Sequence, residues 1–259
     1  MCWRRRKILQ LGENKFKSEF PINAVECFQF AEAELAFIPG ELIARARKSK
    51  LHGSGALIIG FDPAYSESGD WAVMAWRRGR EVIKTEKRRG LNAMGCAGWL
   101  KSVIDAERPG AVYVDATGVG AVADRLLEQG YNQVKPVIFS GKAQEPQRMD
   151  DNGRLVGGFQ NRRAEMYHRL LEALQSEEGL RLPDSDTLHA DLTCFTSRHD
   201  STGRMVLESK DAIRRKLGRS PDEADAVALT FADGLHATGS HGNMPYHGKP
   251  LPYPDLGIY

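Results

Sequence analysis

Two short apolar runs that each end in an aspartate constrain the fold of this chain more than any other feature. The first is Leu57–Asp62, followed by Pro63, and the second is Ala111–Asp115. Apolar runs of this length, rich in β-branched residues and bounded by turn residues, are typical of strands that are buried on both faces. Ligands of an open α/β sheet bind outside the carboxyl ends of its strands, so the two aspartates are predicted to face one crevice.

The sequence around these runs predicts an α/β fold with the element order βββαβαβα. Two more strands follow the first through short connections that contain glycine, which is typical of an antiparallel meander. The remaining elements are predicted from apolar periodicity and turn residues. The predicted strands are 57–62, 71–76, 81–88, 111–115 and 134–139, and the predicted helices are 93–107, 119–129 and 161–176. We therefore expect a mixed five-stranded sheet, with its first three strands antiparallel, flanked by helices.

Shorter elements are predicted on either side of residue 200. A polar, glycine-rich stretch over 140–158 is expected to be a mobile loop. A short helix over 188–192 is predicted to precede a hairpin, whose strands are expected over 193–197 and 205–208. The last element is a helix that starts at Ser220, and the composition beyond residue 236 predicts a flexible tail over 237–259.

The last helix carries an aspartate that local structure does not explain. Ser220, Pro221 and Glu223 fit a capping box at a helix start, which accounts for Glu223. Asp225 lies beyond the cap among apolar neighbours, where a carboxylate is costly unless it is paired or binds a metal. Asp222, three residues earlier, shares its helical face.

Three aspartates at element ends, Asp62, Asp115 and Asp225, come from different parts of the chain and are predicted to meet. Carboxylate oxygens are the ligands that Mg²⁺ and Mn²⁺ prefer. Two such ions held together can activate water and stabilise the leaving oxygen of a phosphodiester. The sequence therefore predicts a metal site at this edge of the sheet.

The charge distribution favours a polyanionic partner, although the net charge is only +2. The basic clusters are Arg77, Arg78 and Arg80; Lys87, Arg88 and Arg89; Arg162 and Arg163; and Arg214, Arg215, Lys216 and Arg219. A solvated face explains any single cluster, but four together favour nucleic acid. The four cysteines are scattered and no apolar run has the length of a membrane span, which fits a reducing cytoplasm.

Three motifs give this order of elements a family resemblance. Gly60–Asp62, Val114–Gly120 and Gly218–Ala226 resemble the C-terminal nuclease domain of tailed-phage or prophage terminase large subunits, in the RNase H-like superfamily, over roughly 55–235. The segments Phe16–Pro21 and Ala24–Phe28 resemble the end of that family's packaging ATPase domain. No G-x-x-x-x-G-K-[ST] loop is found in the sequence. The resemblance implies an ATPase remnant plus linker over 1–50 and an RNase H-like nuclease domain over 55–236.

The same resemblance implies an activity and a set of site residues. It implies two-metal cleavage of double-stranded viral DNA by Mg²⁺ or Mn²⁺ during genome packaging, in the bacterial host cytoplasm, with the terminase small subunit and the portal protein as possible partners. Asp62, Asp115 and Asp225 fall on the metal-binding acids, and Asp222 is expected to be an auxiliary ligand or general base. Lys210 resembles a recurring lysine that could contact the scissile phosphate. The residues expected to bind DNA are Arg88, Arg89, Arg162, Arg163, Arg214, Arg215 and Arg219.

Three other interpretations stay open on the sequence. An actin-like kinase or ATPase also has an acid after its first strand, but Pro63-Ala64 replaces the expected glycine-rich turn and the span is short for two lobes. A Holliday-junction resolvase uses similar acids and would prefer branched DNA. A truncated prophage product could bind DNA or the portal without cutting.

Overall fold

The computed structural model describes residues 36–63, 71–117, 120–149 and 155–235, together with Trp3, Lys7 and Phe20. Its central sheet has the strand order β3-β2-β1-β4-β5. β1 pairs antiparallel with β2 and parallel with β4, and β4 pairs parallel with β5. Apart from Phe20, the segments with an ATPase resemblance lie outside the described residues, as does the predicted 237–259 tail.

The predicted fold class is confirmed, and the bounds of the central elements agree to within a few residues. The sheet strands are β1 Leu57–Asp62, β2 Ala72–Arg78, β3 Glu81–Arg88, β4 Ala111–Asp115 and β5 Val134–Val137. Two small ribbons consist of β6 Arg148–Met149 with β7 Leu155–Val156, and β8 Ser197–His199 with β9 Met205–Leu207. The helices are α4 Gly40–Lys48, α5 Ala93–Glu107, α6 Ala121–Glu128, α7 Arg162–Gln175, α8 Asp186–Thr193, α9 Lys210–Leu217 and α10 Asp222–Leu229.

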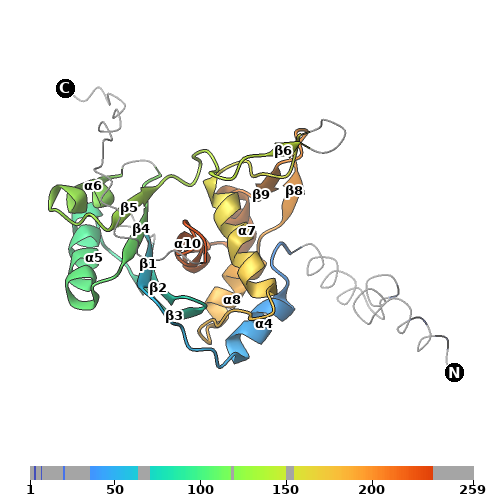
Figure 1. Ribbon diagram of the computed structural model, residues 1–259, viewed down its shortest axis with the longest axis horizontal. Coiled ribbons are helices and arrows are strands. Elements are labelled where there is room, and N and C mark those ends of the chain that lie inside the picture. Colours follow the sequence, from blue (N-terminus) through green and yellow to red (C-terminus); the bar gives the residue numbers. More distant parts are fainter. Residues whose placement is uncertain are drawn as a thin grey trace.

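Helices cover both faces of the sheet, as Figure 1 shows. All six residues of β1 are buried, and its side chains alternate between two cores. Ile59 and Phe61 pack in the core that includes residues of α5 and α6, whereas Ile58 packs in the core that includes residues of α7 and α10. This explains why the run is continuously apolar, since a strand covered on both sides has no solvent face.

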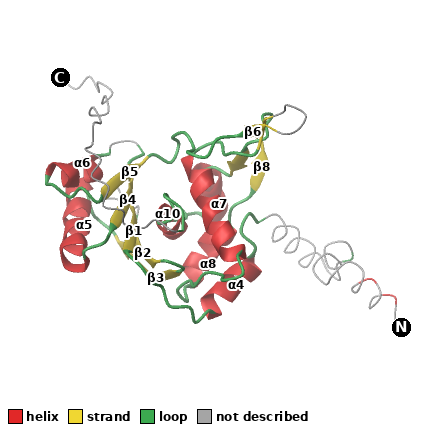
Figure 2. Cartoon of the chain, viewed as in Figure 1, coloured by secondary structure: helices red, strands yellow, loops and turns green. Residues whose placement is uncertain are grey.

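The helix α10 lies between the sheet and α7 (Figures 1 and 2). Every residue from Glu223 to Leu229 is buried, as expected for a helix enclosed on all sides. Its close approach to β1 depends on Gly60, because a Cβ atom at that position would lie 2.1 Å from the carbonyl oxygen of Ala226. The missing side chain of Gly60 therefore lets α10 carry its acids up to the end of β1.

The carboxyl end of α10 is held by three arginines from elsewhere in the chain. Arg77 of β2 is fully buried and donates to the Thr230 carbonyl oxygen at 2.6 Å. Arg162 and Arg169 of α7 both donate to the carbonyl oxygen of Ala232. These carbonyls follow the last helical turn and have no partner within the helix, so the guanidinium groups satisfy them.

Two expectations about local structure are wrong. The capping box at Ser220 does not form: α10 begins at Asp222, the residue before it is Pro221, and no side chain of its own caps it. Instead, the carboxylate of Asp191 accepts from the Glu223 amide at 3.3 Å. The stretch over 140–158 is also not one mobile loop, because β6 and β7 pair within it and the buried Glu165 accepts from the amides of residues 144 and 145.

The core that covers the sheet includes residues before 55, where the resemblance places the start of the nuclease domain. Ile38, Ile43 and Ala46, on and before α4, are buried in the same core as residues of α7 and α10. Helix α9, which starts at Lys210 with Ser209 as its cap, was not predicted from the sequence. A hairpin is present as predicted, although its first strand is shifted to 197–199 because α8 extends to Thr193.

Candidate active site

The predicted acids converge at the carboxyl ends of β1 and β4. Asp62 is the last residue of β1, Asp115 is the last residue of β4, and Asp222 is the first residue of α10; all three line one open hollow of about 550 Å³. Asp225 lies one turn further along α10 and is fully buried behind it. The parallel pairing of β1 with β4 brings the two strand ends together, and α10 adds the other two acids.

The buried carboxylate of Asp225 is held by two side chains of α7. Its Oδ1 accepts from Arg163 Nε at 3.0 Å and from the Tyr167 hydroxyl at 2.9 Å. Both partners are themselves buried. Because both donors approach Oδ1, the carboxylate is fixed in orientation and its Oδ2 is directed to the other side, toward Lys210.

Lys210 bridges two of the acids. Its Nζ lies 3.0 Å from Asp62 Oδ2 and 2.9 Å from Asp225 Oδ2. Among the described residues, no three acidic, histidine or cysteine side chains form a ready-made cage for a metal ion. An ammonium group therefore occupies the space between two of the carboxylates that were expected to share a cation.

Burial dominates the electrostatics of these acids. It raises the pKa of Asp62 to about 8, with the neighbouring Asp115 and Asp225 charges acting in the same direction and Lys210 acting against it. Burial likewise raises the pKa of Asp115. Although burial alone would raise the pKa of Asp225, the cations of Arg163 and Lys210 hold it below its usual value. Asp225 is thus the acid most firmly kept in its charged form.

Thr117 braces Asp115 at the end of β4. The Asp115 Oδ1 accepts from the Thr117 amide at 2.9 Å and from its hydroxyl at 2.5 Å. The same hydroxyl oxygen accepts from the Phe139 amide at 3.0 Å, which links β4 to the segment after β5. The site is therefore tied into the sheet on this side as well.

The acids fit a divalent cation by their chemistry. Asp62 and Asp115 are buried carboxylates whose raised pKa values reflect the cost of holding negative charge there, and a bound cation would relieve that cost. All donors are oxygens, which suits Mg²⁺ or Mn²⁺ rather than a soft metal. Asp62, Asp115, Asp222 and Asp225 are the residues that could hold such an ion.

The arginines expected to bind DNA fall into two groups. Arg162 and Arg163 are buried: Arg162 Nη1 pairs with Glu165 at 2.6 Å, and Arg163 pairs with Asp225. We therefore correct the expectation for these two, since their guanidinium groups stabilise α10 and its acid from inside. Arg88, Arg89, Arg214, Arg215 and Arg219 are exposed, and of these Arg89, Arg214 and Arg219 line a second hollow beside the acids.

Arg88 and Arg89 leave β3 in different directions. The Arg88 guanidinium lies over the ring of Trp99, on α5, at 4.4 Å, whereas the Arg89 guanidinium lies over the ring of Trp71 at 4.1 Å. Trp71 lines both hollows. The sequence predicted Trp71 only as the start of a strand, and it did not predict Tyr167 or Thr117 as site residues. An aromatic residue close to the first acid in sequence was the signal available for Trp71.

In the described part of the chain, no helix is long and apolar enough to cross a membrane. No protein-family model matches the sequence, and no match is found among curated proteins. The solved structures, in contrast, give matches at high probability.

The nuclease domain of the large terminase subunit gp2 of bacterial virus Sf6 is similar over 75% of this chain and 97% of that chain, with 21% identity and a TM-score of 0.65. A variant of the same Sf6 domain with manganese and beta-thujaplicinol matches over the same shares with 21% identity and a TM-score of 0.64. The variant with manganese covers 75% of this chain and 98% of that chain, with 20% identity and a TM-score of 0.63. The chain therefore has the RNase H-like fold of large terminase nuclease domains.

Proposed function

We propose that this chain is a metal-dependent endonuclease that cuts double-stranded viral DNA during genome packaging. The observation that carries the proposal is the convergence of four aspartates from β1, β4 and α10 at one edge of the sheet. The fold supports it, because it is the fold of terminase nuclease domains, one of which is described with manganese. Terminase small subunit and portal protein as partners, and the host cytoplasm as location, belong to the same proposal.

Each residue has a role that its position suggests. Mg²⁺ or Mn²⁺ ions held by Asp62, Asp115, Asp225 and Asp222 would supply an activated water and stabilise the leaving oxygen. Asp222, which lines the hollow, would accept a proton or complete the ligand set. Lys210 compensates the charges of Asp62 and Asp225 and, with DNA bound, would neutralise the scissile phosphate. The exposed arginines would contact phosphates without reading bases.

Plasmid cleavage tests the proposal. Purified chain is incubated with supercoiled plasmid and Mg²⁺, Mn²⁺ or EDTA, beside Asp62→Asn and Asp225→Asn. We expect metal-dependent nicking and linearisation by the wild type and a loss of at least a hundredfold in both variants, because each removes a charged ligand. Asp105→Asn on α5 is the matched control and should cleave like the wild type, since Asp105 is exposed, pairs with Lys101 on the same helix, and lines neither the acid site nor its hollow.

Two results would overturn the proposal. Equal cleavage by wild type and both variants would place any activity elsewhere. DNA binding without cleavage under all metal conditions, by chain whose thermal melting shows that it is folded, would favour the non-cleaving binding module.

A further inference from the structure

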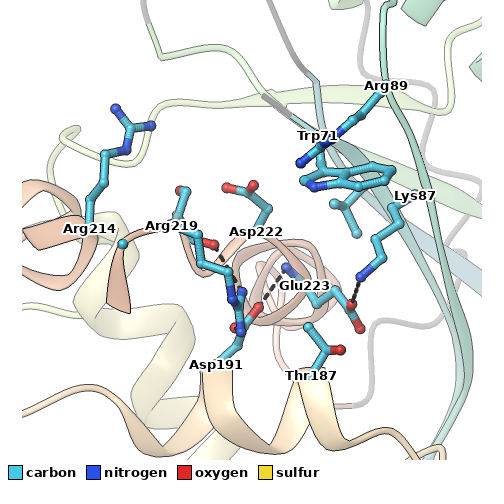
Figure 3. A pocket seen from close by; sticks show the side chains of 12 residues that line it. Trp71, Lys87, Arg89, Thr187, Asp191, Arg214, Arg219, Asp222 and Glu223 are labelled. Carbon is cyan, nitrogen blue, oxygen red and sulfur yellow. Dashed lines mark hydrogen bonds and ion pairs between the residues drawn. The ribbon is translucent and has the colours of Figure 1, made fainter. Parts of the chain in front are cut away.

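A second hollow adjoins the acid site. It has a volume of about 460 Å³, within the range of pockets that hold small ligands. Four residues line both hollows, so the two are contiguous: Trp71, Arg214, Ser220 and Asp222. Figure 3 shows the second hollow, with Trp71 and Arg89 on one side, Arg214 on the other, and Asp222 between them.

The cations of this hollow are only partly compensated by its acids. Lys87 pairs with Glu223 at 2.8 Å, and Arg219 pairs with Asp191 at 2.5 Å, as the dashed lines of Figure 3 mark. Within each of these pairs the two opposite charges compensate each other. Arg89 forms its described contact with the Trp71 ring rather than with a carboxylate. In all, the cations Lys87, Arg89, Arg214 and Arg219 line the hollow against the acids Asp191, Asp222 and Glu223, which leaves one positive charge in excess.

Ser220 gives the hollow a feature that packing does not explain. Ser220 is 9% exposed, and its hydroxyl oxygen has no hydrogen-bond partner among the described residues. A buried hydroxyl without a partner destabilises the folded state, and the Ser220 hydroxyl does not offset this by capping α10. A hydroxyl at the junction of the two hollows can donate to a ligand oxygen there.

Trp71 supplies an aromatic wall beside that hydroxyl. The indole is partly buried, and Arg89 lies over its ring at 4.1 Å. In Figure 3 Arg89 lies above the indole and Glu223 below it. Proteins that bind single strands of nucleic acid combine aromatic side chains, on which the bases stack, with cationic side chains that contact the phosphates.

We propose that this second hollow binds one nucleotide of the DNA strand next to the phosphate held at the acids. Its base stacks on the Trp71 ring in place of the exposed Arg89 side chain, and its phosphate accepts from Ser220 and is neutralised by Arg214 and Arg219. The inference rests on the proposed function for the identity of the strand. It adds that the strand is gripped through an aromatic contact as well as through phosphates, so that the base beside the cut is drawn out of regular stacking.

A mononucleotide probe tests this without metal or cleavage. Thymidine 3′,5′-bisphosphate and 2-deoxyribose 5-phosphate are titrated into the full chain in EDTA, and binding is followed by calorimetry and by the indole N–H resonances. We expect the bisphosphate to bind and to shift the Trp71 resonance, assigned through its absence in Trp71→Leu. Trp71→Leu should weaken the bisphosphate about tenfold and leave the sugar phosphate unchanged, while Trp71→Phe should retain most of the affinity.

Ser220→Ala separates the phosphate contact from the stacking contact. It should weaken both probes by about fivefold, the worth of one hydrogen bond, without lowering the melting temperature, because the hydroxyl has no partner to lose. Ser102→Ala on α5, whose hydroxyl donates to the Trp99 carbonyl at 2.7 Å, is the matched control and should leave binding unchanged.

The outcomes distinguish this inference from the proposed function. Bisphosphate binding that is unaffected by Trp71→Leu and Ser220→Ala, or no binding by chain that cleaves plasmid, overturns the nucleotide site and leaves the nuclease standing. Binding with both variant effects, by chain that fails to cleave plasmid under every metal condition, supports the nucleotide site while the nuclease proposal fails.

Discussion

The two ends of α10 differ in the kind of polar group that each presents. At the carboxyl end, Arg77, Arg162 and Arg169 donate to the carbonyls that follow the helix. At the amino end, Asp222 and Asp225 lie in a group of four acids, of which Asp62 and Asp225 contact Lys210 and Asp225 also pairs with Arg163. One end is built for stability, whereas the other keeps charge that a ligand can use. The difference indicates that the first end fixes the position of the second.

The substitution expected to have the largest effect is Gly60→Ala, because Gly60 contacts α10 between its two ends. The added methyl group would lie 2.1 Å from the Ala226 carbonyl oxygen and 3.0 Å from side-chain atoms of Leu229 and Thr230, so α10 must move away from β1. We expect a loss of about 3 kcal/mol in the free energy of unfolding, together with loss of plasmid cleavage. Urea denaturation measures the first effect.

Gly98→Ala is the matched control for that substitution. Gly98 is exposed within α5, and an added methyl group there meets nothing within 4 Å. It should raise the free energy of unfolding by about 1 kcal/mol, because alanine favours a helix over glycine. Equal stability of Gly60→Ala and wild type would show that the fold does not depend on the close packing of α10 against β1.

Arg77→Met tests the carboxyl end of α10. It leaves the carbonyl oxygens of Thr230 and Gly79 without their donors in a buried place, and it removes the guanidinium that lies 4.4 Å from the Phe231 ring centre. We expect a loss of about 2–3 kcal/mol, measured by urea denaturation. The neighbouring Arg78→Met should cost no more than about 0.5 kcal/mol, because Arg78 makes an exposed bond to Gly55. Similar losses in the two variants would contradict a special role for Arg77.

The pH dependence of stability tests the amino end, where the acids lie. The pKa of Asp62 is raised to about 8, so the folded state holds a proton that the unfolded state releases at a lower pH. The stability that this proton confers is complete below the unfolded pKa and is lost as the pH rises through the folded pKa.

In EDTA we therefore expect the wild type to lose at least about 1 kcal/mol between pH 5 and pH 8, the worth of roughly one pKa unit, relative to Asp62→Asn. Denaturant titrations at several pH values measure it. Added Mn²⁺ should reduce the loss, because a cation stabilises the charged carboxylate. Parallel pH profiles of wild type and Asp62→Asn would show that Asp62 titrates normally.

Tyr167→Phe is expected to have the smallest effect on stability, and it tests how α7 orients the acid Asp225. It removes one donor to Asp225 Oδ1 and leaves the Arg163 contact in place. We expect a loss of about 1 kcal/mol in stability and about tenfold weaker Mn²⁺ binding, since the carboxylate is less firmly oriented. Calorimetry measures the metal affinity.

Tyr131→Phe is the control for that variant, because the Tyr131 hydroxyl bonds to the exposed Asp105. Unchanged Mn²⁺ affinity in Tyr167→Phe would mean that Arg163 alone orients Asp225.

The sequence predicted the sheet and the placing of Asp62 and Asp115 because both depend on local patterns. A continuously apolar strand that ends in an acid specifies its own burial and its own exit point. The isolated position of Asp225 among apolar residues predicted a carboxylate that is paired or binds a metal, and in the structure Arg163, Tyr167 and Lys210 contact it.

What the sequence did not predict depends on contacts between distant segments. Arg162 and Arg163 look like a surface pair in the sequence, but the carboxylate and carbonyl groups that bury them come from α7 itself and from residues 225 and 232. Ser220 fits a capping pattern, yet Asp191 takes the amide that a cap would bind. The second hollow was not predictable for the same reason, since β3, α8, α9 and α10 each contribute to its wall.

The wide spacing of the site residues also has a consequence for synthesis of the chain. Lys210 and Asp62 lie 148 residues apart, and Asp225 comes later still. A ribosome that has completed β1 and β4 has made only half of the acids, and the ammonium group that bridges them does not yet exist. Pairing across such a distance is a late event in folding, because a long loop must close first. The complete set of acids therefore comes together only after α9 and α10 have been made and have docked.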